Sequence, residues 1–215
     1  KPREISVITY TNRAADENRE RIRKLYRGDF GHERNLDDIF IGTIHAWCLE
    51  LIHRHLPRYL QFELLDGMQQ FLFIQRHYSK IFPEGGLIYR TAKMNDIVAT
   101  KGVTLRHAAK LFNVLRESRL DKSKITFGNA ETCLKRYEAL MHEHCKFDFS
   151  ALLCLVADSL MKDTAFRRAV VNQLKCVIVD EYQDTNHAQE RVLQRLRLAS
   201  DEQIKLGKVR ISHQT

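Results

Sequence analysis

The pattern of hydrophobic and polar positions predicts strand–helix units at the N-terminal side of the chain. An apolar, β-branched run at 4–11 is typical of a buried strand, and 12–26 carries apolar residues at helical spacing. A second short strand is expected at 38–42. Thr43 then occupies the N-cap position of an amphipathic helix that Pro57 ends. This half of the pattern therefore predicts two strand–helix units, with a loop between them.

The C-terminal side predicts another such unit with a more distinctive strand. Residues 175–180 form a short apolar run that ends in Asp180, which is typical of a central strand of a parallel sheet. A helix capped at 148–150 precedes this strand, and another helix, capped at 184–186, follows it. Residues 200–215 are polar and lack clear periodicity, so this end of the chain looks atypical.

The middle of the chain predicts helices rich in Arg, Lys and His, without convincing strand alternation. The expected helical segments are 66–82, 104–118 and 129–145. Strand–helix units at both ends and helices between them predict an α/β domain with an all-helical insertion. We assign the α/β domain to 1–58 and 147–199, the insertion to 59–146 and an atypical tail to 200–215.

The composition narrows the class of protein and its partners. Hydrophobic residues make up 44% and charged residues 29%, which is typical of a soluble globular protein. No apolar run approaches the roughly 18 residues of a membrane-spanning helix, so we expect no membrane partner. The net charge of +8 favours a polyanionic partner such as nucleic acid. Five scattered cysteines, an odd number, indicate reduced thiols in a cytoplasmic protein.

Asp180 and Glu181 are the sharpest candidates for chemistry. Two acids at the tip of a buried strand suit nucleotide hydrolysis, because the first can hold Mg²⁺ through water and the second can deprotonate the attacking water. Two solvated acids at a strand end would give the same short pattern. The pair by itself therefore leaves both interpretations open.

Four segments, in the same order along the chain, resemble motifs of the UvrD/Rep/PcrA group of superfamily-1 DNA helicases. Residues 180–189 (DEYQDTNHAQ) resemble the extended Walker B motif, 9–22 (TYTNRAADENRERI) motif Ia, and 42–52 (GTIHAWCLELI) motif Ib. Residues 146–153 (KFDFSALL) resemble the element that leads into Walker B. The resemblance implies a RecA-like, parallel-sheet P-loop NTPase motor domain, incomplete in this chain, with a helical insertion of suitable size.

The resemblance also implies roles for individual residues. Asp180 would hold Mg²⁺ through water, Glu181 would be the catalytic base, and Gln183 and Asp184 would link the nucleotide to neighbouring motifs. The implied DNA-binding residues are Tyr10, Thr11, Asn12, Arg13, Thr43 and His45. An aromatic ring can stack on any base, and hydroxyl, amide and Arg groups can bind phosphates. The expected cofactors are ATP and Mg²⁺. The expected partners are single-stranded DNA, single-strand/duplex junctions and the remainder of the helicase chain.

Several departures from the family pattern bear on these roles. Ile44 and Ala46 replace the usual Phe and Ser of motif Ib, which removes a ring and a hydroxyl. Asn18 replaces a common Met, which we expect to be a mild change on the helix face. The phosphate-loop pattern G-x-x-x-x-G-K-[ST] is absent from these 215 residues. In the family it lies upstream of motif Ia, so we expect it before Lys1, and we see no family-like sequence after about Ala199.

Two classes of function stay open from the sequence. The first is part of an ATP-dependent DNA helicase or translocase that couples Mg-ATP hydrolysis to movement on single-stranded DNA and to duplex unwinding. The second is a catalytically dead remnant that at most binds nucleic acid or a partner. In both cases we expect the 215-residue chain alone to be inactive, because a phosphate loop and a second motor domain are missing from it.

Two rival kinds of site are disfavoured. The candidate zinc ligands are Cys133, His142, His144 and Cys145. They lack the C-x₂₋₄-C spacing of structural zinc sites, and we therefore expect no zinc. Cys48 lies near His45, but it belongs to an apolar helix stripe, where a buried thiol is inert as a nucleophile.

Overall fold

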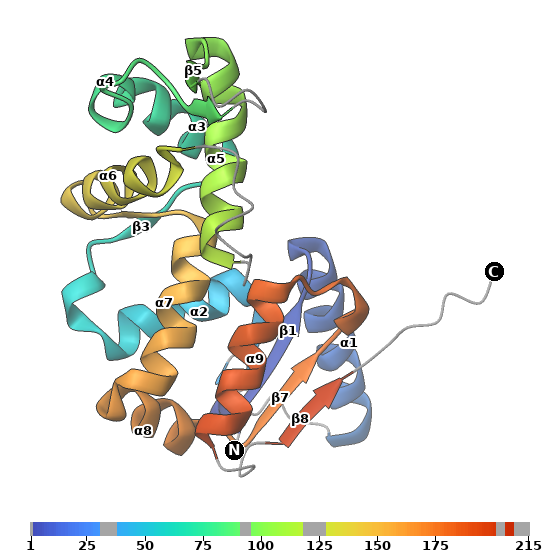
Figure 1. The fold of residues 1–215 in the computed structure, drawn as a ribbon. Helices are drawn as coiled ribbons and strands as arrows, with labels where there is room; N and C mark the ends of the chain where they lie inside the picture. The colour runs from blue at the N-terminus through green and yellow to red at the C-terminus, as the bar shows by residue number, and fades with distance from the viewer. Residues whose placement is uncertain (1, 31–37, 91–95, 118–127, 201–204, 209–215) are drawn as a thin grey trace. The chain divides into compact units, whose positions relative to one another are not determined.

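The computed structural model describes residues 2–30, 38–90, 96–117, 128–200 and 205–208 (Figure 1). The chain divides into two compact units, one formed by residues 1–60 with 155–215 and the other by residues 61–154. Our sequence assignment had the insertion at 59–146. Each unit is described by itself below.

The first unit is built on a parallel sheet of four described strands in the order β2-β1-β7-β8. The strands are β1 (Ile5–Thr9), β2 (Phe40–Thr43), β7 (Cys176–Val179) and β8 (Lys205–Lys208). Val7 of β1 lies opposite Ile41 of β2 on one side and opposite Ile178 of β7 on the other. The apolar run before Asp180 is therefore an inner strand, and the predicted α/β, RecA-like class is confirmed.

β8 lies within the segment that the sequence marks as an atypical tail. It pairs in parallel with β7, so that Cys176 is opposite Lys205 and Val179 is opposite Lys208. The pairing uses backbone groups, and β8 lies at the end of the described strand order. A strand in that position needs no alternation of hydrophobic side chains, which is why the pattern gave no signal.

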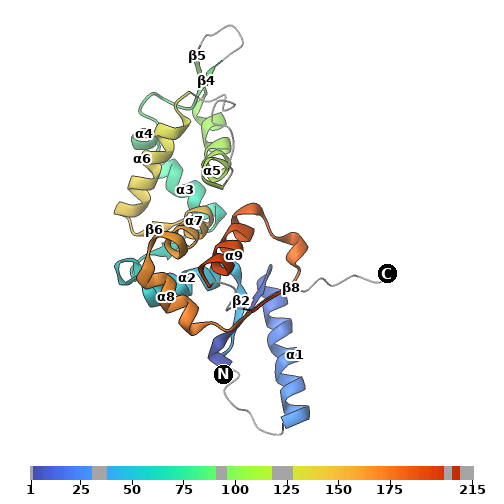
Figure 2. The same ribbon diagram turned by 60° about the horizontal axis from the view of Figure 1, so that its bottom comes forward.

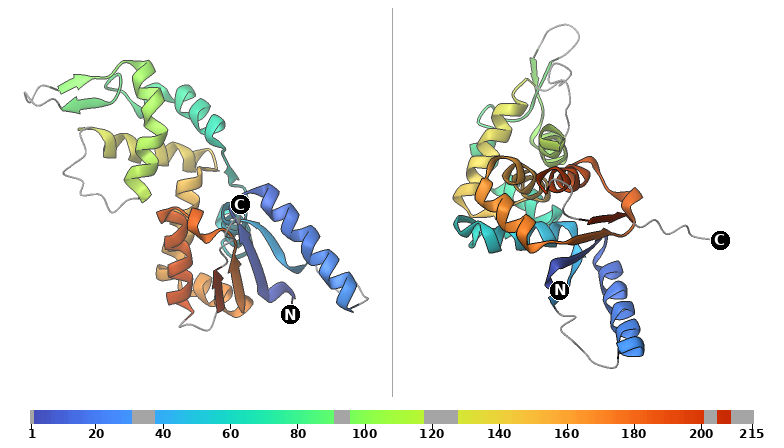
Figure 3. Two further views of the ribbon diagram at one scale, coloured as in Figure 1. Left: turned by 90° about the vertical axis from the view of Figure 1, so that its right-hand side faces the viewer. Right: turned by 90° about the horizontal axis from the view of Figure 1, so that it is seen from below.

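Helices cover both faces of this sheet (Figure 3). They are α1 (Asn12–Phe30), α2 (Ile44–His55), α8 (Thr164–Gln173) and α9 (His187–Ala199), with the second half of α7 (Phe149–Lys162). α1 lies on one face, and α8 and α9 lie on the other. Short 3-10 turns occur at Pro2–Glu4, Pro57–Tyr59 and Tyr182–Asp184.

The N-caps were the most predictable feature of these helices. Thr43 caps α2, and Asn186 caps α9 in a reciprocal capping box with Gln189. The end of α1 was less predictable, because this helix continues through Gly28 into the expected loop. α8 was not predicted at all, although Asp163 caps it through the Phe166 amide.

Packing on the sheet fixes the start of α1. Ala15, the fourth residue of the helix, is buried against Val7 and Ile41 of the two neighbouring strands. Trp47 and Cys48 of α2 are also buried. Both helices are thus anchored by apolar contacts close to the point where they leave the sheet, which holds their first turns in place.

The second unit is mainly helical. Its helices are α3 (Gly67–Arg76), α4 (Tyr78–Ile81), α5 (Lys101–Glu117), α6 (Ala130–Glu143) and the first turns of α7. Phe112 of α5 stacks on Tyr137 of α6 at a ring-centroid distance of 5.0 Å, and Phe82 stacks on Phe112 at 6.3 Å. These rings form the centre of the hydrophobic core of this unit.

Short strands in this unit correct the expectation that the insertion is entirely helical. β3 (Glu63–Leu64) pairs in parallel with β6 (Lys146–Phe147), and β4 (Ile88–Arg90) pairs with β5 (Asp96–Val98) as an antiparallel hairpin (Figure 2). Runs of two or three residues are too short for alternation to be visible in a sequence. The hairpin also depends on Gly86, because a Cβ atom there would lie 2.3 Å from the Ala99 carbonyl oxygen.

A buried polar network joins the helices of the second unit around Asp148. Arg116 Nη1 donates to both oxygens of the Asp148 carboxylate, at 2.8 and 2.6 Å, and both side chains are buried, at 6% and 2% exposure. Tyr137 Oη donates to Asp148 Oδ2 at 2.9 Å, and Gln70 Nε2 donates to the same atom at 3.2 Å. Asp148 Oδ1 accepts from the Ala151 amide at 2.7 Å and thereby caps α7, as predicted. One carboxylate therefore holds four helices together.

Candidate functional site

A sharp turn at the end of β7 presents the two acids. The Asp180 amide still donates to the Ile8 carbonyl at 2.8 Å, as a residue in the sheet would. Glu181 then has a φ of +52°, in the left-handed region that residues other than glycine rarely adopt. Strained backbone of this kind is concentrated at functional sites, where the surrounding structure holds it. The acids thus lie at the carboxyl end of an inner parallel strand.

The Asp180 carboxylate is oriented by two hydrogen bonds. Its Oδ1 atom accepts from the Glu181 amide at 3.0 Å, and its Oδ2 atom accepts from Asn18 Nδ2 on α1 at 2.9 Å. The side chain is half-buried. A carboxylate has about four lone-pair sites, so two accepted hydrogen bonds leave capacity for further ligands.

The residues after Asp180 hold the turn together. Gln183 Nε2 donates to Glu181 Oε2, and Tyr182 Oη donates to Glu190 Oε1 of α9 at 2.8 Å. The Asp184 amide donates to the Glu181 carbonyl at 2.9 Å. Glu181 is half-buried, whereas Gln183 and Asp184 are exposed. The structure therefore brings Gln183 onto Glu181 and places Asp184 at the surface of the same turn.

The turn that carries Asp180 and Glu181 is called the acid turn below. A small cavity lies between this acid turn and residues at the start of the helices expected to bind DNA. It has a volume of about 10 Å³, which is about the room that one water molecule needs. Tyr10, Ile44, Asp180 and Glu181 contribute to its lining. The motif Ia and Walker B segments, separated by about 170 residues in the sequence, thus meet at one end of the sheet.

The first turns of α1 and α2 lie at this same end of the sheet. Thr11 Oγ1 accepts from the Ala14 amide at 3.1 Å, and Thr43 Oγ1 accepts from the Ala46 amide at 3.3 Å. Both threonines therefore act as N-caps, and neither helix has an acid in its first turn. Helix N-termini present amide hydrogens and a partial positive charge, which favour phosphate groups.

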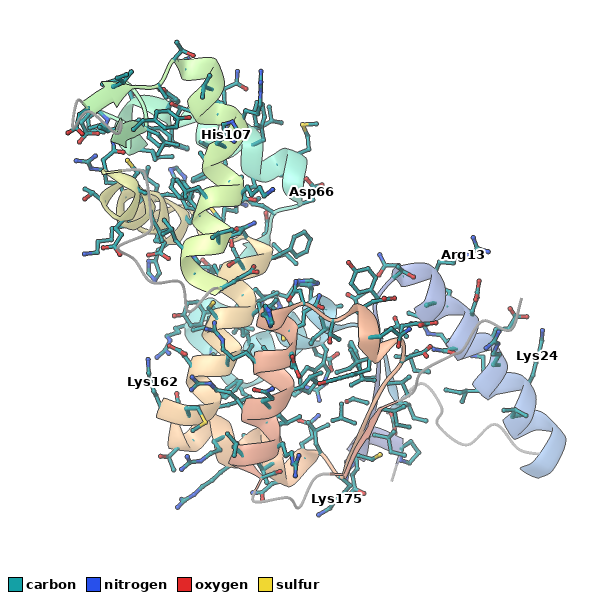
Figure 4. All side chains as sticks on the ribbon, turned by 45° about the vertical axis from the view of Figure 1, so that its right-hand side comes forward. Arg13, Lys24, Asp66, His107, Lys162 and Lys175 are labelled. Atoms are coloured by element: carbon teal, nitrogen blue, oxygen red, sulfur yellow. The ribbon has the colours of Figure 1, made fainter. Side chains whose placement is uncertain are left out.

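The remaining expected DNA-binding side chains differ in how open they are. Tyr10 is 54% exposed, Asn12 is exposed, and the Arg13 side chain is 90% exposed while paired with Glu17 at 3.0 Å. Figure 4 shows Arg13 at the end of the sheet opposite Lys175, which precedes β7. His45 is half-buried, and burial lowers its pKa, so the neutral imidazole is favoured at neutral pH.

The rival sites receive no support from the geometry. Burial raises the pKa of the Cys48 thiol far above its ordinary value, which keeps it protonated. Burial also raises the pKa of Cys133 to about 11. Within the described ranges, no group of three or more His, Cys, Asp or Glu side chains is arranged to hold a metal ion. All five cysteines are described, and none is bonded to another.

Comparison with known proteins defines the class. The family model for the UvrD/REP helicase N-terminal domain matches residues 1–207. The chain therefore belongs to the UvrD/Rep helicase family. The match continues to the end of the sheet, so our expectation that family-like sequence ends near residue 199 is wrong. Among the described residues, no helix is long and apolar enough to cross a membrane.

Individual relatives are distant, and all of them are longer. The chain is 28% identical to the ATP-dependent DNA helicase SRS2 of Saccharomyces cerevisiae, with 87% of the chain and 17% of the relative covered. It is 26% identical to a probable DNA helicase of Mycoplasma pneumoniae, covering 91% of the chain and 36% of the relative. It is 25% identical to the ATP-dependent DNA helicase Rep of Escherichia coli, covering 90% of the chain and 27% of the relative. The chain thus spans between about a sixth and about a third of these relatives.

Proposed function

We propose that this chain is part of the first motor domain of an ATP-dependent DNA helicase, with Asp180 and Glu181 as its hydrolytic pair. The observation that carries the proposal is the meeting of two features at one end of the parallel sheet. The acid turn after β7 and the exposed Tyr10 line the same small cavity. A motor that couples hydrolysis to movement needs its nucleotide and DNA contacts mechanically connected, and the closeness of these two segments supports that role.

The family implies ATP and Mg²⁺ as cofactors, and the residues of this chain fit only part of what these cofactors need. Asp180 offers hard carboxylate oxygens with spare lone pairs, which suits a hydrated Mg²⁺ ion. ATP supplies a phosphoryl group whose transfer to water releases the free energy for movement. These 215 residues contain no G-x-x-x-x-G-K-[ST] segment to cradle its phosphates. The fit therefore supports Asp180 as the Mg²⁺ acid and requires other residues for the phosphates.

Each side chain of the acid turn has its own role in the proposed hydrolysis of ATP. Glu181 accepts the proton of the attacking water, which a carboxylate can do when its orientation is fixed. The hydrogen bond from Gln183 Nε2 to Glu181 Oε2 supplies that orientation. Asp180 would hold the water ligands of a bound Mg²⁺ ion. Asp184 and Gln183 are exposed on the same turn, and their assigned role is to link the nucleotide to neighbouring motifs of the motor.

DNA binding is assigned to the two helix starts. Tyr10 supplies a ring for a base, and the amides and hydroxyls of the Thr11 and Thr43 caps bind phosphates. Asn12 and Arg13 extend the polar surface at the start of α1, and His45 contributes a neutral imidazole in the first turn of α2. None of these groups reads base identity, which is what tracking along any sequence requires.

We expect the purified 215-residue chain to show no ATP turnover and no unwinding. The acid pair has no phosphate loop within the chain to bring ATP to it. Phosphate release should be measured with saturating single-stranded DNA over a range of protein concentrations. Turnover that rises in proportion to the concentration of this chain, and that Glu181→Gln removes, would contradict the expectation.

We expect the same chain to bind single-stranded DNA weakly and without sequence preference. Affinity should fall steeply with salt, because bound Lys and Arg release counterions. Tyr10→Ala should weaken binding by ~1–3 kcal/mol if a base stacks on the ring. Leu198→Ala, which truncates a 67% exposed side chain near the end of α9, is the control. Fluorescence anisotropy of a labelled oligonucleotide measures both variants, and equal affinities would exclude the stacking role.

A further inference from the structure

One hydrogen bond at the acid turn involves a residue to which the family motifs assign no role. Asn18 Nδ2 of α1 donates to Asp180 Oδ2 at 2.9 Å, across 162 positions of sequence. Asn18 stands where the family motif commonly has Met, a change that from the sequence alone we expect to be mild. A thioether cannot donate a hydrogen bond, so the substitution gives this chain a contact that Met could not make.

The contact is built on a rigid support. Asn18 and Thr11 are seven positions apart and therefore share one face of α1. Between them, Ala15 is buried against Val7 and Ile41, which fixes the helix on the sheet. Asn18 itself is half-buried, so its amide is partly shielded from competing water. The donor is thus held at a fixed position relative to β7.

The bond determines which way the Asp180 carboxylate faces. The other oxygen of this carboxylate accepts from the Glu181 amide, which is part of the same turn. Asn18 contributes the side-chain donor from outside the turn. Hydrogen bonds to a ligating carboxylate orient it, and their loss typically costs 10–100-fold in metal affinity or activity.

We propose that Asn18 is a positioning residue that orients the Asp180 carboxylate for Mg²⁺, an inference that rests on the proposed function. It does not touch the metal or the nucleotide. It acts by holding one oxygen of Asp180 in place, which would leave the remaining lone pairs of the carboxylate available to a hydrated Mg²⁺ ion. Its loss therefore weakens the use of Mg²⁺ while leaving the fold and the DNA contacts at the start of α1 in place.

The experiment uses the full-length polypeptide that contains these residues, with saturating single-stranded DNA. ATP turnover is measured against Mg²⁺ concentration for the wild type, Asn18→Met and Asn18→Ala. We expect the Mg²⁺ concentration for half-maximal turnover to rise about 10-fold in both variants. Turnover at saturating Mg²⁺ should recover to within about twofold of wild type, because the acid pair itself is intact.

Two further measurements separate positioning from a structural role. The affinity for single-stranded DNA and the thermal midpoint of unfolding should stay unchanged in both variants, because Thr11 caps α1 independently of Asn18. Lys24→Met is the control on the same helix, since it breaks only a surface ion pair with Glu20 (Figure 4). If the larger Met side chain lowers the thermal midpoint, the Mg²⁺ dependence of the smaller Asn18→Ala variant decides whether the lost hydrogen bond to Asp180 is the cause.

The outcomes distinguish this inference from the proposed function. If Glu181→Gln abolishes turnover but Asn18→Met and Asn18→Ala keep the wild-type Mg²⁺ dependence, the positioning role is wrong and the function stands. If Glu181→Gln turns over normally, the assignment of the acid pair fails, and the role of Asn18 fails with it. A Mg²⁺ shift that Lys24→Met reproduces would also overturn the positioning role.

Discussion

Glu181→Gln, made in the full-length polypeptide, should lower DNA-stimulated ATP turnover by at least ~100-fold, the usual scale for losing a positioned general base. The amide keeps the shape of the side chain but cannot accept the proton of the attacking water. Gln183 would still have an oxygen to which it can donate, so the turn should persist. ATP binding and single-stranded DNA binding should survive, because Asp180 and the starts of α1 and α2 are unchanged.

Asp180→Asn provides the comparison that distinguishes the role of the catalytic base, Glu181, from that of the carboxylate that holds Mg²⁺, Asp180. It should also lower turnover, but the defect should depend on Mg²⁺ concentration, because the change removes charge from the metal site. If both acids only ended a strand, neither variant would change turnover. Steady-state phosphate release across a Mg²⁺ series, with circular dichroism to verify folding, distinguishes these possibilities.

Arg116→Met should destabilise the second unit by about 3–5 kcal/mol, because it leaves the Asp148 carboxylate buried without its charged partner. Burial alone would lower the pKa of Arg116, but the charges of Asp148 and Glu138 outweigh it, and the pKa is raised above its ordinary value. Arg116 is therefore a permanent cation at this position. Urea unfolding of the 215-residue chain, followed by circular dichroism, measures the loss.

Two further variants test whether burial is the cause. Arg136→Met breaks the more exposed pair with Glu84, and it should cost at most about 1 kcal/mol. The double variant Arg116→Met/Asp148→Asn removes both charges and retains a residue that can cap α7. It should recover part of the stability lost in Arg116→Met. Equal unfolding midpoints for Arg116→Met and Arg136→Met would contradict the role of the network.

Local signals explain which parts of the fold could be predicted. The run before Asp180 and the caps at Thr43 and Asn186 depend on a few adjacent residues, and all three form as predicted. β8 and the β4–β5 hairpin were missed, because three or four residues carry too little pattern and their pairing depends on distant partners. The left-handed conformation of Glu181 likewise has no signal in a residue type that rarely adopts it.

In the candidate site, too, the features set by adjacent residues were predictable and those set by distant contacts were not. The apolar run at 175–180 predicted that Asp180 and Glu181 lie at a strand end, where the structure has them. The hydrogen bond from Asn18 to Asp180 joins α1 to the end of β7, and no periodicity within either segment indicates it. The network around Asp148 was also hidden, since only its capping role is local. Contacts that orient functional groups come from tertiary packing, which a single sequence pattern does not report.

The proposed function is tested most directly by ATP hydrolysis of the full-length polypeptide and of its Glu181→Gln variant, each with and without single-stranded DNA. We expect single-stranded DNA to stimulate hydrolysis by the wild type. We also expect Glu181→Gln to lose at least ~100-fold in turnover while binding DNA as tightly as the wild type. Near-normal turnover by Glu181→Gln, or wild-type hydrolysis that is indifferent to single-stranded DNA, would contradict it.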